Sequence, residues 1–427
     1  MPLTEDILAY IADHPGARRE DIRRNAARDV SETTVWRALK RLLEEKKLEV
    51  TGKSRATGYS LAGVPVVRAH MAVPYNRRKP ASYNKEFLDN YLPGNTYYLD
   101  ETERSTLREA GTPVSGPLPA GTYARQILEK LLVDLSWASS RMEGNTYSIL
   151  DTERLIRFGE EATGKDRKEA LMILNHKEAI QYLVDSIDDI TICRQDICNV
   201  HALLSDGLLI DPAMAGRLRR MPAGIGASSY TPLEDQVQIE EEFDIVMQKA
   251  AAISEPFEQS FFILVHIPYL QAFDDVNKRT SRVASNIPLL KADLAPISFF
   301  AMNDRDYIDG LLGVYELNNV SLLKEAFIDA YLASVQNYKA IRAEVETPDK
   351  AALAYRDFVR QAVRQCVLDW KQFHEGNVIT MAAKANIPEA DRQDVVKYVG
   401  QEFNGLHEGN VIRYRLSPDD LANLRRD

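Results

Sequence analysis

The chain of 427 residues has few cysteines and no long hydrophobic run. Its cysteines, Cys193, Cys198 and Cys366, are odd in number and lack metal-ligand spacing, which argues against a disulfide framework and favours reduced thiols. The most apolar stretch, FFILVHIPYL at 261–270, is well short of the roughly 20 residues that span a bilayer, so no membrane association is expected. The first residues, MPLTED, lack the basic and apolar regions of a secretory signal, and a cytoplasmic protein is therefore expected.

The chain also lacks an excess of basic residues. It has 63 Asp and Glu against 53 Lys and Arg, a net charge of −10, which argues against the whole molecule coating nucleic acid. A single basic segment can still do so. The hydrophobic share of 45% is that of a globular protein, and the length allows two or three domains.

Residues 1–62 are expected to form a winged helix-turn-helix domain. The helical stretches TEDILAYIADHPGA and REDIRRNA precede a longer helix with Ser31 as its N-cap, and two short β-type runs in LEVTGKSRATGYSL follow. The third helix and the hairpin tip would present polar and basic side chains outward, namely Thr33, Thr34, Arg37, Arg41, Lys53 and Arg55. These residue types suit phosphate oxygens and base edges, so DNA is one expected partner and another protein is the alternative.

Three further regions follow. Residues 63–120 are rich in Pro, Gly and Tyr and are interpreted as a linker with some ordered structure. Residues 121–345 show successive helical periodicities joined by short breaks, which predicts an all-α core. Residues 346–427 are interpreted as a small helical or winged-helix-like module, in which IRYRLSPDDLANL at 412–424 predicts a strand and then a capped helix. The expected fold class is mostly α.

One short segment of the core concentrates charge of both signs. QAFDDVNKRTSR at 271–282 directly follows the most apolar run. If one helix stops near residue 270 and another begins near Val276 or Asn277, the first amides of the second helix are unpaired and form an anion site. Arg279 and Arg282 lie on one face of that helix, and Asp275 can hold a Mg²⁺ that bridges phosphates. A capped surface helix with solvated charges is the alternative.

A second segment of the core can form an extended hairpin or flap. RLRRMPAGIGASSYTPL at 217–233 places Gly224, Ile225 and Gly226 between two prolines, so its backbone edge can be presented. A plain surface loop is the alternative reading of this segment alone.

The charged segment resembles the signature loop of the Fic family, whose pattern is His, any residue, Phe, any residue, Asp or Glu, Gly, Asn, Gly or Lys, Arg, any two residues, Arg. The matching positions are Phe273, Asp275, Asn277, Arg279 and Arg282. With Lys278, the segment 277–279 is similar to the Doc branch of the family, in which Lys replaces the second Gly of the pattern. The resemblance implies ATP or another nucleotide as the ligand of Asn277, Lys278, Arg279 and Arg282, with Mg²⁺ on Asp275.

A second element supports the resemblance. SSRMEGN at 139–145 resembles the family's inhibitory motif through Ser139, Glu143 and Gly144. The resemblance implies that Glu143 pairs with Arg282 and keeps the γ-phosphate from seating productively. It also implies that 217–233 is the flap that aligns the substrate. In all, it covers residues 121–345, which would form a Fic-type helical core with a β-hairpin flap.

Two positions depart from the family pattern. Gln271 stands where the family has its general base, a His, and a neutral amide cannot take up a proton near neutral pH. Val276 replaces the first Gly with a β-branched residue. His266 is about 140° round the helix from Gln271, which favours a hydrogen-bonded core histidine over a substitute base.

Two functions from different classes follow. The first is a self-inhibited transferase that moves AMP or a related nucleotidyl or phosphoryl group to a hydroxyl of a target protein, with Gln271 at the catalytic base position. The second is a nucleotide-sensing DNA-binding regulator whose core binds a nucleotide without turning it over. Gln271 favours the second function, and Glu143 favours the first, because an inactive site needs no inhibitor. A homo-oligomer is compatible with both.

Overall fold

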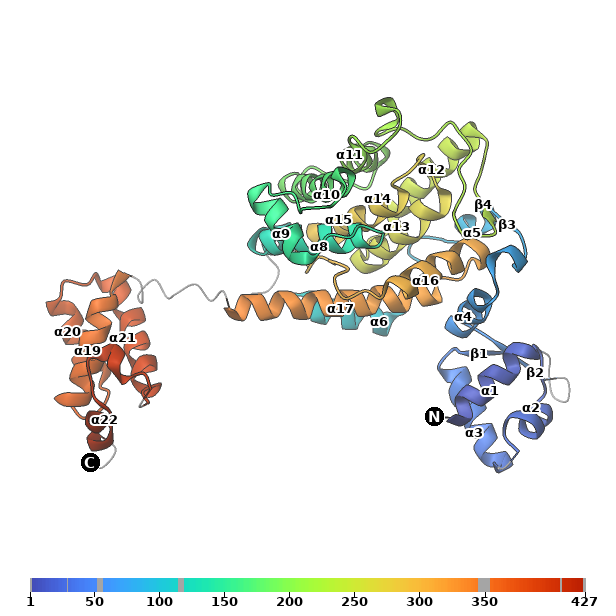
Figure 1. The fold of residues 1–427 in the computed structure, drawn as a ribbon. Helices are drawn as coiled ribbons and strands as arrows, with labels where there is room; N and C mark the ends of the chain where they lie inside the picture. The colour runs from blue at the N-terminus through green and yellow to red at the C-terminus, as the bar shows by residue number, and fades with distance from the viewer. Residues whose placement is uncertain are drawn as a thin grey trace. The chain divides into compact units, whose positions relative to one another are not determined.

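The computed structural model describes residues 2–28, 30–51, 57–113, 119–344, 354–407 and 409–424. The chain divides into two units, Met1–Tyr338 and Lys339–Asp427. Helices dominate both units (Figure 1), so the expected mostly α-helical fold class is confirmed. Within the described ranges, none of the helices combines the length and the apolar character needed to cross a bilayer.

The first unit opens with three helices and an antiparallel hairpin, in the order expected from the sequence. The elements are α1 (Pro2–Asp13), α2 (Arg19–Ala26), α3 (Glu32–Glu44), β1 (Leu48–Thr51) and β2 (Gly58–Leu61). The Ser31 side chain accepts a hydrogen bond from the Thr34 amide and so caps α3, because a helix N-terminus leaves its first amides unpaired. Ile22, Val35 and Leu39 are buried in a small core of this segment. The predicted hairpin tip with Lys53 and Arg55 lies outside the described residues.

The segment after the hairpin differs from the expected linker. It contains α4 (Val64–Ala72), the 3-10 helix η2 (Tyr75–Arg77), β3 (Ala81–Ser82), α5 (Lys85–Asp89) and α6 (Glu101–Gly111). Leu88 and Leu107 are fully buried. The buried carboxylate of Glu258 accepts hydrogen bonds from the amides of Tyr98, at 2.6 Å, and Leu99, at 2.9 Å. This segment therefore packs as part of the helical unit, because its scattered apolar side chains are core residues.

The rest of the first unit is a helical assembly around α13. Its elements are α7 (Thr122–Gln126), α8 (Leu128–Arg141), α9 (Ile149–Phe158), α10 (Arg167–Asp185), α11 (Arg194–Ser205), η3 (Pro212–Met214), β4 (Tyr230–Thr231), α12 (Gln236–Ala252), α13 (Pro256–Leu270), α14 (Asn277–Ala284), α15 (Asn286–Lys291), α16 (Asp304–Leu317) and α17 (Ser321–Glu344). α13 packs against α12, α14, α15 and α16, and nearly all of its side chains are buried. A helix that is apolar all round requires such cover. The turn after α13 therefore starts inside the assembly.

The segment 217–233 differs in one respect from the expected hairpin. Its only strand, β4, pairs in parallel with β3, so the partner strand comes from residues 81–82. Figure 1 shows β3 and β4 side by side at one edge of the unit. The residues before β4 form a loop whose first part is held by Arg219, a fully buried residue. Its guanidinium donates to the carbonyl oxygens of Gln271, at 2.6 Å, Met221, at 2.9 Å, and Leu233.

The end of this loop is held by a buried carboxylate on α16. Glu316 accepts hydrogen bonds from the Ser228 hydroxyl, at 2.7 Å, and the Ser229 amide, at 3.2 Å. His70 Nε2, at 2.7 Å, and Arg78 Nη1, at 3.3 Å, contact the same carboxylate. A buried charge is stable only when it is paired in this way. Both ends of the segment are thus fixed to the helical assembly.

The second unit is a separate helical module. It comprises α19 (Arg356–Leu368), α20 (Glu375–Lys384), α21 (Glu389–Asn404), η4 (Val411–Tyr414) and α22 (Pro418–Leu424), which enclose their own core. The predicted strand at the start of 412–424 is wrong. A 3-10 turn forms there and ends at Arg415, which has a left-handed backbone with φ +55°. The turn buries Val411 and Tyr414, so the alternating pattern did not reflect a pleated strand.

Candidate functional site

The turn between α13 and α14 leaves backbone donors free. α13 ends at Leu270, where Gln271 adopts φ +51°, and α14 begins at Asn277, as the sequence predicts. The Asn277 side chain closes the turn by accepting from the Phe273 amide, at 2.9 Å, and donating to the Phe273 carbonyl, at 2.8 Å. The first helical hydrogen bond comes from the Thr280 amide, so among the described residues no acceptor pairs with the amides of 277–279. Free amides at a helix start attract anions.

A cavity of about 550 Å³ lies beside these amides. Its walls come from the two segments singled out in the sequence and from one face of α16, and its lining includes Pro222, Gly224, Ile225, Gly226, Asp275, Lys278, Arg279, Ile308, Leu311 and Tyr315. The volume is within the usual range for small-molecule sites. One wall is charged and another is apolar, which suits a ligand with an anionic part and a flat organic part.

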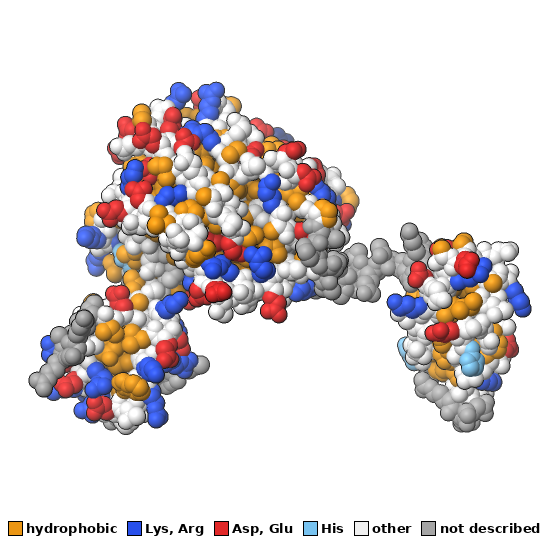
Figure 2. All heavy atoms as spheres, turned by 180° about the vertical axis from the view of Figure 1, so that it is seen from behind, with side chains coloured by type: hydrophobic (Ala, Val, Ile, Leu, Met, Phe, Trp, Pro, Cys, Tyr) orange, Lys and Arg blue, Asp and Glu red, His pale blue; other side chains and the backbone are white. Residues whose placement is uncertain are grey.

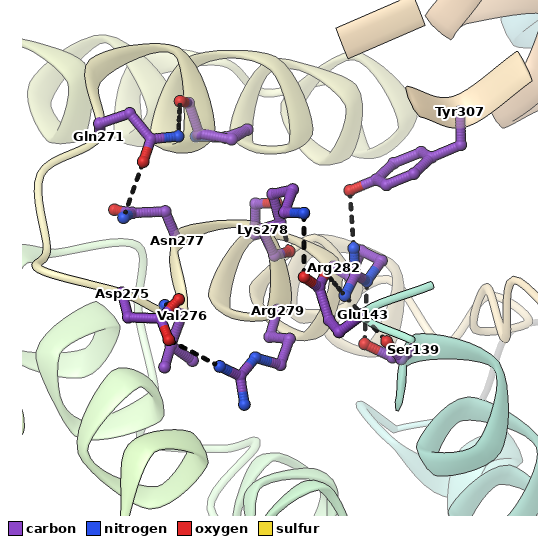
Figure 3. Close-up of polar contacts among 12 residues, drawn as sticks. Ser139, Glu143, Gln271, Asp275, Val276, Asn277, Lys278, Arg279, Arg282 and Tyr307 are labelled. Carbon is purple, nitrogen blue, oxygen red and sulfur yellow. Dashed lines mark hydrogen bonds and ion pairs between the residues drawn. The ribbon is translucent and has the colours of Figure 1, made fainter. Parts of the chain in front are cut away.

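Arg282 is fully buried near the charged end of this site, and its guanidinium is held by several acceptors (Figure 3). Nε donates to the Ser139 hydroxyl, at 2.8 Å, and Nη2 to the Ser139 carbonyl, at 3.0 Å. Nη1 donates to the Tyr307 hydroxyl, at 2.9 Å. These contacts from α8 and α16 fix the orientation of the planar guanidinium.

Glu143 pairs with two cations of the charged loop. Oε1 lies 2.6 Å from Arg282 Nη2, and Oε2 lies 2.9 Å from Lys278 Nζ (Figure 3). Burial raises the pKa of this carboxyl, but Arg282 and Lys278 outweigh burial and lower it to about 2. Glu143 is therefore ionised at neutral pH. Gly144, with φ +88°, lets the chain turn away directly after this contact.

Arg279 lines the cavity, and one of its guanidinium nitrogens is buried without a partner among the described residues. Its Nη2 lies 3.4 Å from Asp275 Oδ2, while the buried Nη1 has no partner among the described residues. A buried donor without an acceptor is costly, so an anion that reached Nη1 would be stabilised by it. The Asp275 side chain is 69% exposed. No cluster of three His, Cys, Asp or Glu side chains suited to a metal occurs in the described parts of the chain. One accessible carboxylate fits Mg²⁺ only together with phosphate oxygens and water.

Gln271 is part of the turn's own hydrogen bonding. Its Nε2 donates to the Pro268 carbonyl, at 2.7 Å, and its Oε1 accepts from Asn277 Nδ2, at 3.2 Å. His266 is buried and contacts the Tyr98 hydroxyl at 2.8 Å, as expected for a core histidine. Neither residue supplies a proton acceptor of ordinary basicity: an amide does not titrate, and burial lowers the pKa of His266 to about 3.

Val276 has a strained backbone at the start of α14. Its φ is +66°, a left-handed conformation that costs a β-branched residue roughly 1–2 kcal/mol. The side chain is buried. The position that the family pattern assigns to Gly therefore keeps the backbone of a Gly while carrying a Val.

The sequence analysis did not identify a buried histidine that contacts the turn between α13 and α14. The His201 ring stacks on Phe273 with centroids 4.0 Å apart. Its Nδ1 accepts from the Gly216 amide, at 3.0 Å, so its Nε2 donates to the Asp275 carbonyl, at 3.2 Å. Burial lowers the pKa of His201 to about 4, which keeps the ring neutral. Arg219 was missed as well. Both residues lie on segments far from the motif, and no spacing pattern marks them.

The predicted DNA-contacting residues are all exposed on α3. They are Thr33, Thr34, Arg37 and Arg41. Arg41 is paired with Glu45 at 2.6 Å. On the face shown in Figure 2, acidic and basic side chains are interspersed over the N-terminal part of the chain, so the surface seen there is not uniformly basic.

Comparison with known proteins agrees with the resemblance. Residues 191–289 match the model of the Fic/DOC family. The chain is 26% identical over 233 residues to "Protein adenylyltransferase Fic" of Nematostella vectensis, covering 52% of this chain and 54% of that protein. It is 24% identical over 188 residues to "Protein adenylyltransferase fic-1" of Caenorhabditis elegans, covering 42% of this chain and 36% of that protein. The chain thus spans about half or less of the length of these relatives.

The chain is also similar to two solved structures, at lower sequence identity. A Fic family protein from Desulfovibrio desulfuricans has a TM-score of 0.47 and 17% identity, covering 65% of this chain and 82% of that one. Fic-1 from C. elegans has a TM-score of 0.45 and 19% identity, covering 57% of this chain and 72% of that one.

Proposed function

We propose that this chain, which carries a Fic/DOC domain at residues 191–289, transfers AMP from ATP to a hydroxyl of a protein and is held inactive by Glu143. The observation that carries the proposal is the Glu143 carboxylate, which is paired with Lys278 and Arg282 beside the free amides of α14. An internal anion here occupies cations that a phosphate would otherwise bind. The relatives named protein adenylyltransferase support the type of transfer.

Each group at the site has a role in this proposal. The amides of 277–279 and the free Arg279 nitrogen bind phosphate oxygens, and Lys278 and Arg282 bind the terminal phosphate once Glu143 withdraws. Asp275 would hold Mg²⁺, which would neutralise phosphate charge when bound. Gly224, Ile225 and Gly226 would align the target segment along the cavity.

The chemistry is a displacement at the α-phosphorus. The target oxygen forms a bond to phosphorus while the bond to the pyrophosphate oxygen breaks, and pyrophosphate leaves. Gln271 cannot accept the hydroxyl proton, so the proton passes to water or to a phosphate oxygen. Positioning and charge still lower the barrier, and a slow reaction is expected.

Labelled ATP tests this proposal. The full chain with Glu143→Gly is incubated with Mg²⁺ and a lysate, with ATP labelled at either the α or the γ phosphate. Protein-bound α-label and no γ-label are expected. The matched control is Glu143→Gly with Arg279→Ala, which should abolish labelling. If Glu143→Gly binds ATP yet transfers neither label, the transferase proposal is wrong.

A second function is favoured by the same departure at Gln271 together with the exposed polar face of α3. In this case the core binds a nucleotide without turnover and the N-terminal segment binds duplex DNA. The expected result is salt-dependent DNA binding by the full chain that Arg37→Glu with Arg41→Glu removes. Charge reversal at Arg23 and Arg24 on α2 is the control. Equal loss in both variants would indicate a non-specific charge effect and contradict reading of DNA by α3.

A further inference from the structure

A buried histidine on α10 contacts the residue that holds Arg282. His176 is fully buried, with Nδ1 2.7 Å from the Met172 carbonyl and Nε2 2.8 Å from the Ser139 hydroxyl. A carbonyl oxygen can only accept, so Nδ1 carries the hydrogen. In a neutral ring Nε2 then carries none and accepts from Ser139. These contacts fix both the tautomer of His176 and the direction of the Ser139 hydroxyl.

The direction of that hydroxyl determines what it offers Arg282. Because the Ser139 hydrogen points to His176, a lone pair of Oγ faces Nε of Arg282, at 2.8 Å. Arg282 also donates to the Ser139 carbonyl and to Tyr307. None of these three contacts involves Glu143. When Glu143 withdraws, Arg282 therefore retains them, and the Nη2 hydrogen that Glu143 had occupied becomes available.

The environment keeps His176 in its accepting form. Burial, reinforced by the nearby charges of Arg279 and Arg282, lowers the pKa of His176 to about 3. The His176 ring is therefore neutral in the folded protein at neutral pH. A protonated ring would instead donate to Ser139, whose hydroxyl hydrogen would lose its acceptor.

We propose that His176 is a positioning residue of the phosphate site: through the Ser139 hydroxyl it holds Arg282 in place for a phosphate whether or not Glu143 is paired with it. This inference rests on the proposed function. It predicts that His176 matters for ligands that reach Arg282, such as the terminal phosphates of ATP, and not for AMP, which lacks them.

The test is the ratio of ATP to AMP affinity in the full chain carrying Glu143→Gly. Adding His176→Leu removes the acceptor of the Ser139 hydroxyl and should thereby break the hydrogen bond between Ser139 and the charged Arg282. The loss of such a bond should lower ATP affinity roughly tenfold and leave AMP affinity unchanged. Adding His176→Gln, whose carbonyl oxygen can accept from Ser139, should retain the ratio within about twofold. His266→Leu is the matched control, since His266 is equally buried but contacts Tyr98. It should lower thermal stability without changing the ratio.

An equal loss of ATP and AMP affinity in His176→Leu, or the same change of ratio in His266→Leu, would overturn the inference. If His176→Leu does not fold, Ser139→Ala replaces it, and an unchanged ratio in that variant has the same meaning. A Glu143→Gly protein that binds no nucleotide contradicts the proposed function instead. In that case crystal structures without nucleotide still decide the inference. Arg282 should remain on Ser139 and Tyr307 in Glu143→Gly and leave them when His176→Leu is added, and an unmoved Arg282 would overturn it.

Discussion

Asn277 Nδ2 donates a hydrogen bond to Gln271 Oε1 over 3.2 Å, so the residues at the two ends of the charged turn are joined through their side chains. The Gln271 amide also donates to the Pro268 carbonyl, at 2.7 Å. Both polar ends of Gln271 are thus used to shape the turn. A residue in this position can support the phosphate site while contributing no proton acceptor.

Replacement of Gln271 by His should restore such an acceptor. The imidazole Nδ1 can donate to the Pro268 carbonyl, which leaves Nε2 unprotonated toward the cavity. In the Glu143→Gly background we expect an initial rate of transfer from α-labelled ATP about 10² higher. The rate should also rise with pH through the pKa of the new histidine. Gln271→Asn is the control, and an equal rate in the His and Asn variants would contradict a missing base.

The ion pairs of Glu143 should make its contribution to stability sensitive to acid. Its folded pKa, about 2, is below the ordinary value of 4.5, so the stabilisation is present above about pH 4.5 and is lost as the pH falls toward 2. The full effect is on the order of 3 kcal/mol. Urea unfolding of the parent and of Glu143→Gln should differ most at pH 7 and progressively less toward pH 3. A difference that does not change with pH would contradict the ionised pair.

Val276→Gly should cost less stability than an ordinary buried Val→Gly change. Lost burial and the added chain entropy of Gly together cost about 3 kcal/mol, while relief of the left-handed strain gives back roughly 1–2 kcal/mol. Val283 is also buried but lies in regular α14, so Val283→Gly gains no relief and should cost about 3 kcal/mol. Thermal unfolding of the two variants measures the contrast. Equal losses would mean that Val276 is not strained.

Arg219→Met should loosen the flap. The change keeps an apolar side chain of similar length but leaves the carbonyls of Gln271, Met221 and Leu233 without their donor. Each buried acceptor left unpaired costs about 1–3 kcal/mol. We expect a lower unfolding midpoint and faster hydrogen exchange in residues 219–233. Arg217→Met, at a neighbouring exposed residue, is the control. Unchanged exchange in Arg219→Met would show that the flap is held by other contacts.

The sequence predicted the parts of the site that are local. The helix break before Asn277 followed from an apolar run meeting a charged one. The pairing of Glu143 with Arg282, which are far apart in the chain, was implied only by the resemblance to the Fic family. The Lys278 contact with Glu143, and the buried His201 and Arg219, could not be predicted. They depend on segments that meet only in the folded chain, and no helical or strand periodicity marks a single buried polar residue.

Local patterns did not determine the structure of two segments. Residues 63–120, interpreted as a linker with some ordered structure because Pro, Gly and Tyr are frequent, contain Leu88 and Leu107, which are fully buried. Residues 412–416 alternate like a strand, but the unit offers them no strand to pair with, and a tight 3-10 turn buries Tyr414 instead. In both cases tertiary packing decided the outcome over local pattern.

The two fixed ends of the flap determine how it can respond to a ligand. Arg219 holds one end of the flap and Glu316 the other, so any bending is expected to be concentrated between them, near Gly224 and Gly226. A loop whose two ends are fixed loses less conformational freedom when a partner binds than a free loop does. The flap would therefore be largely preformed before a target segment binds. Complementarity in shape, more than folding of the flap, would then determine which segments bind.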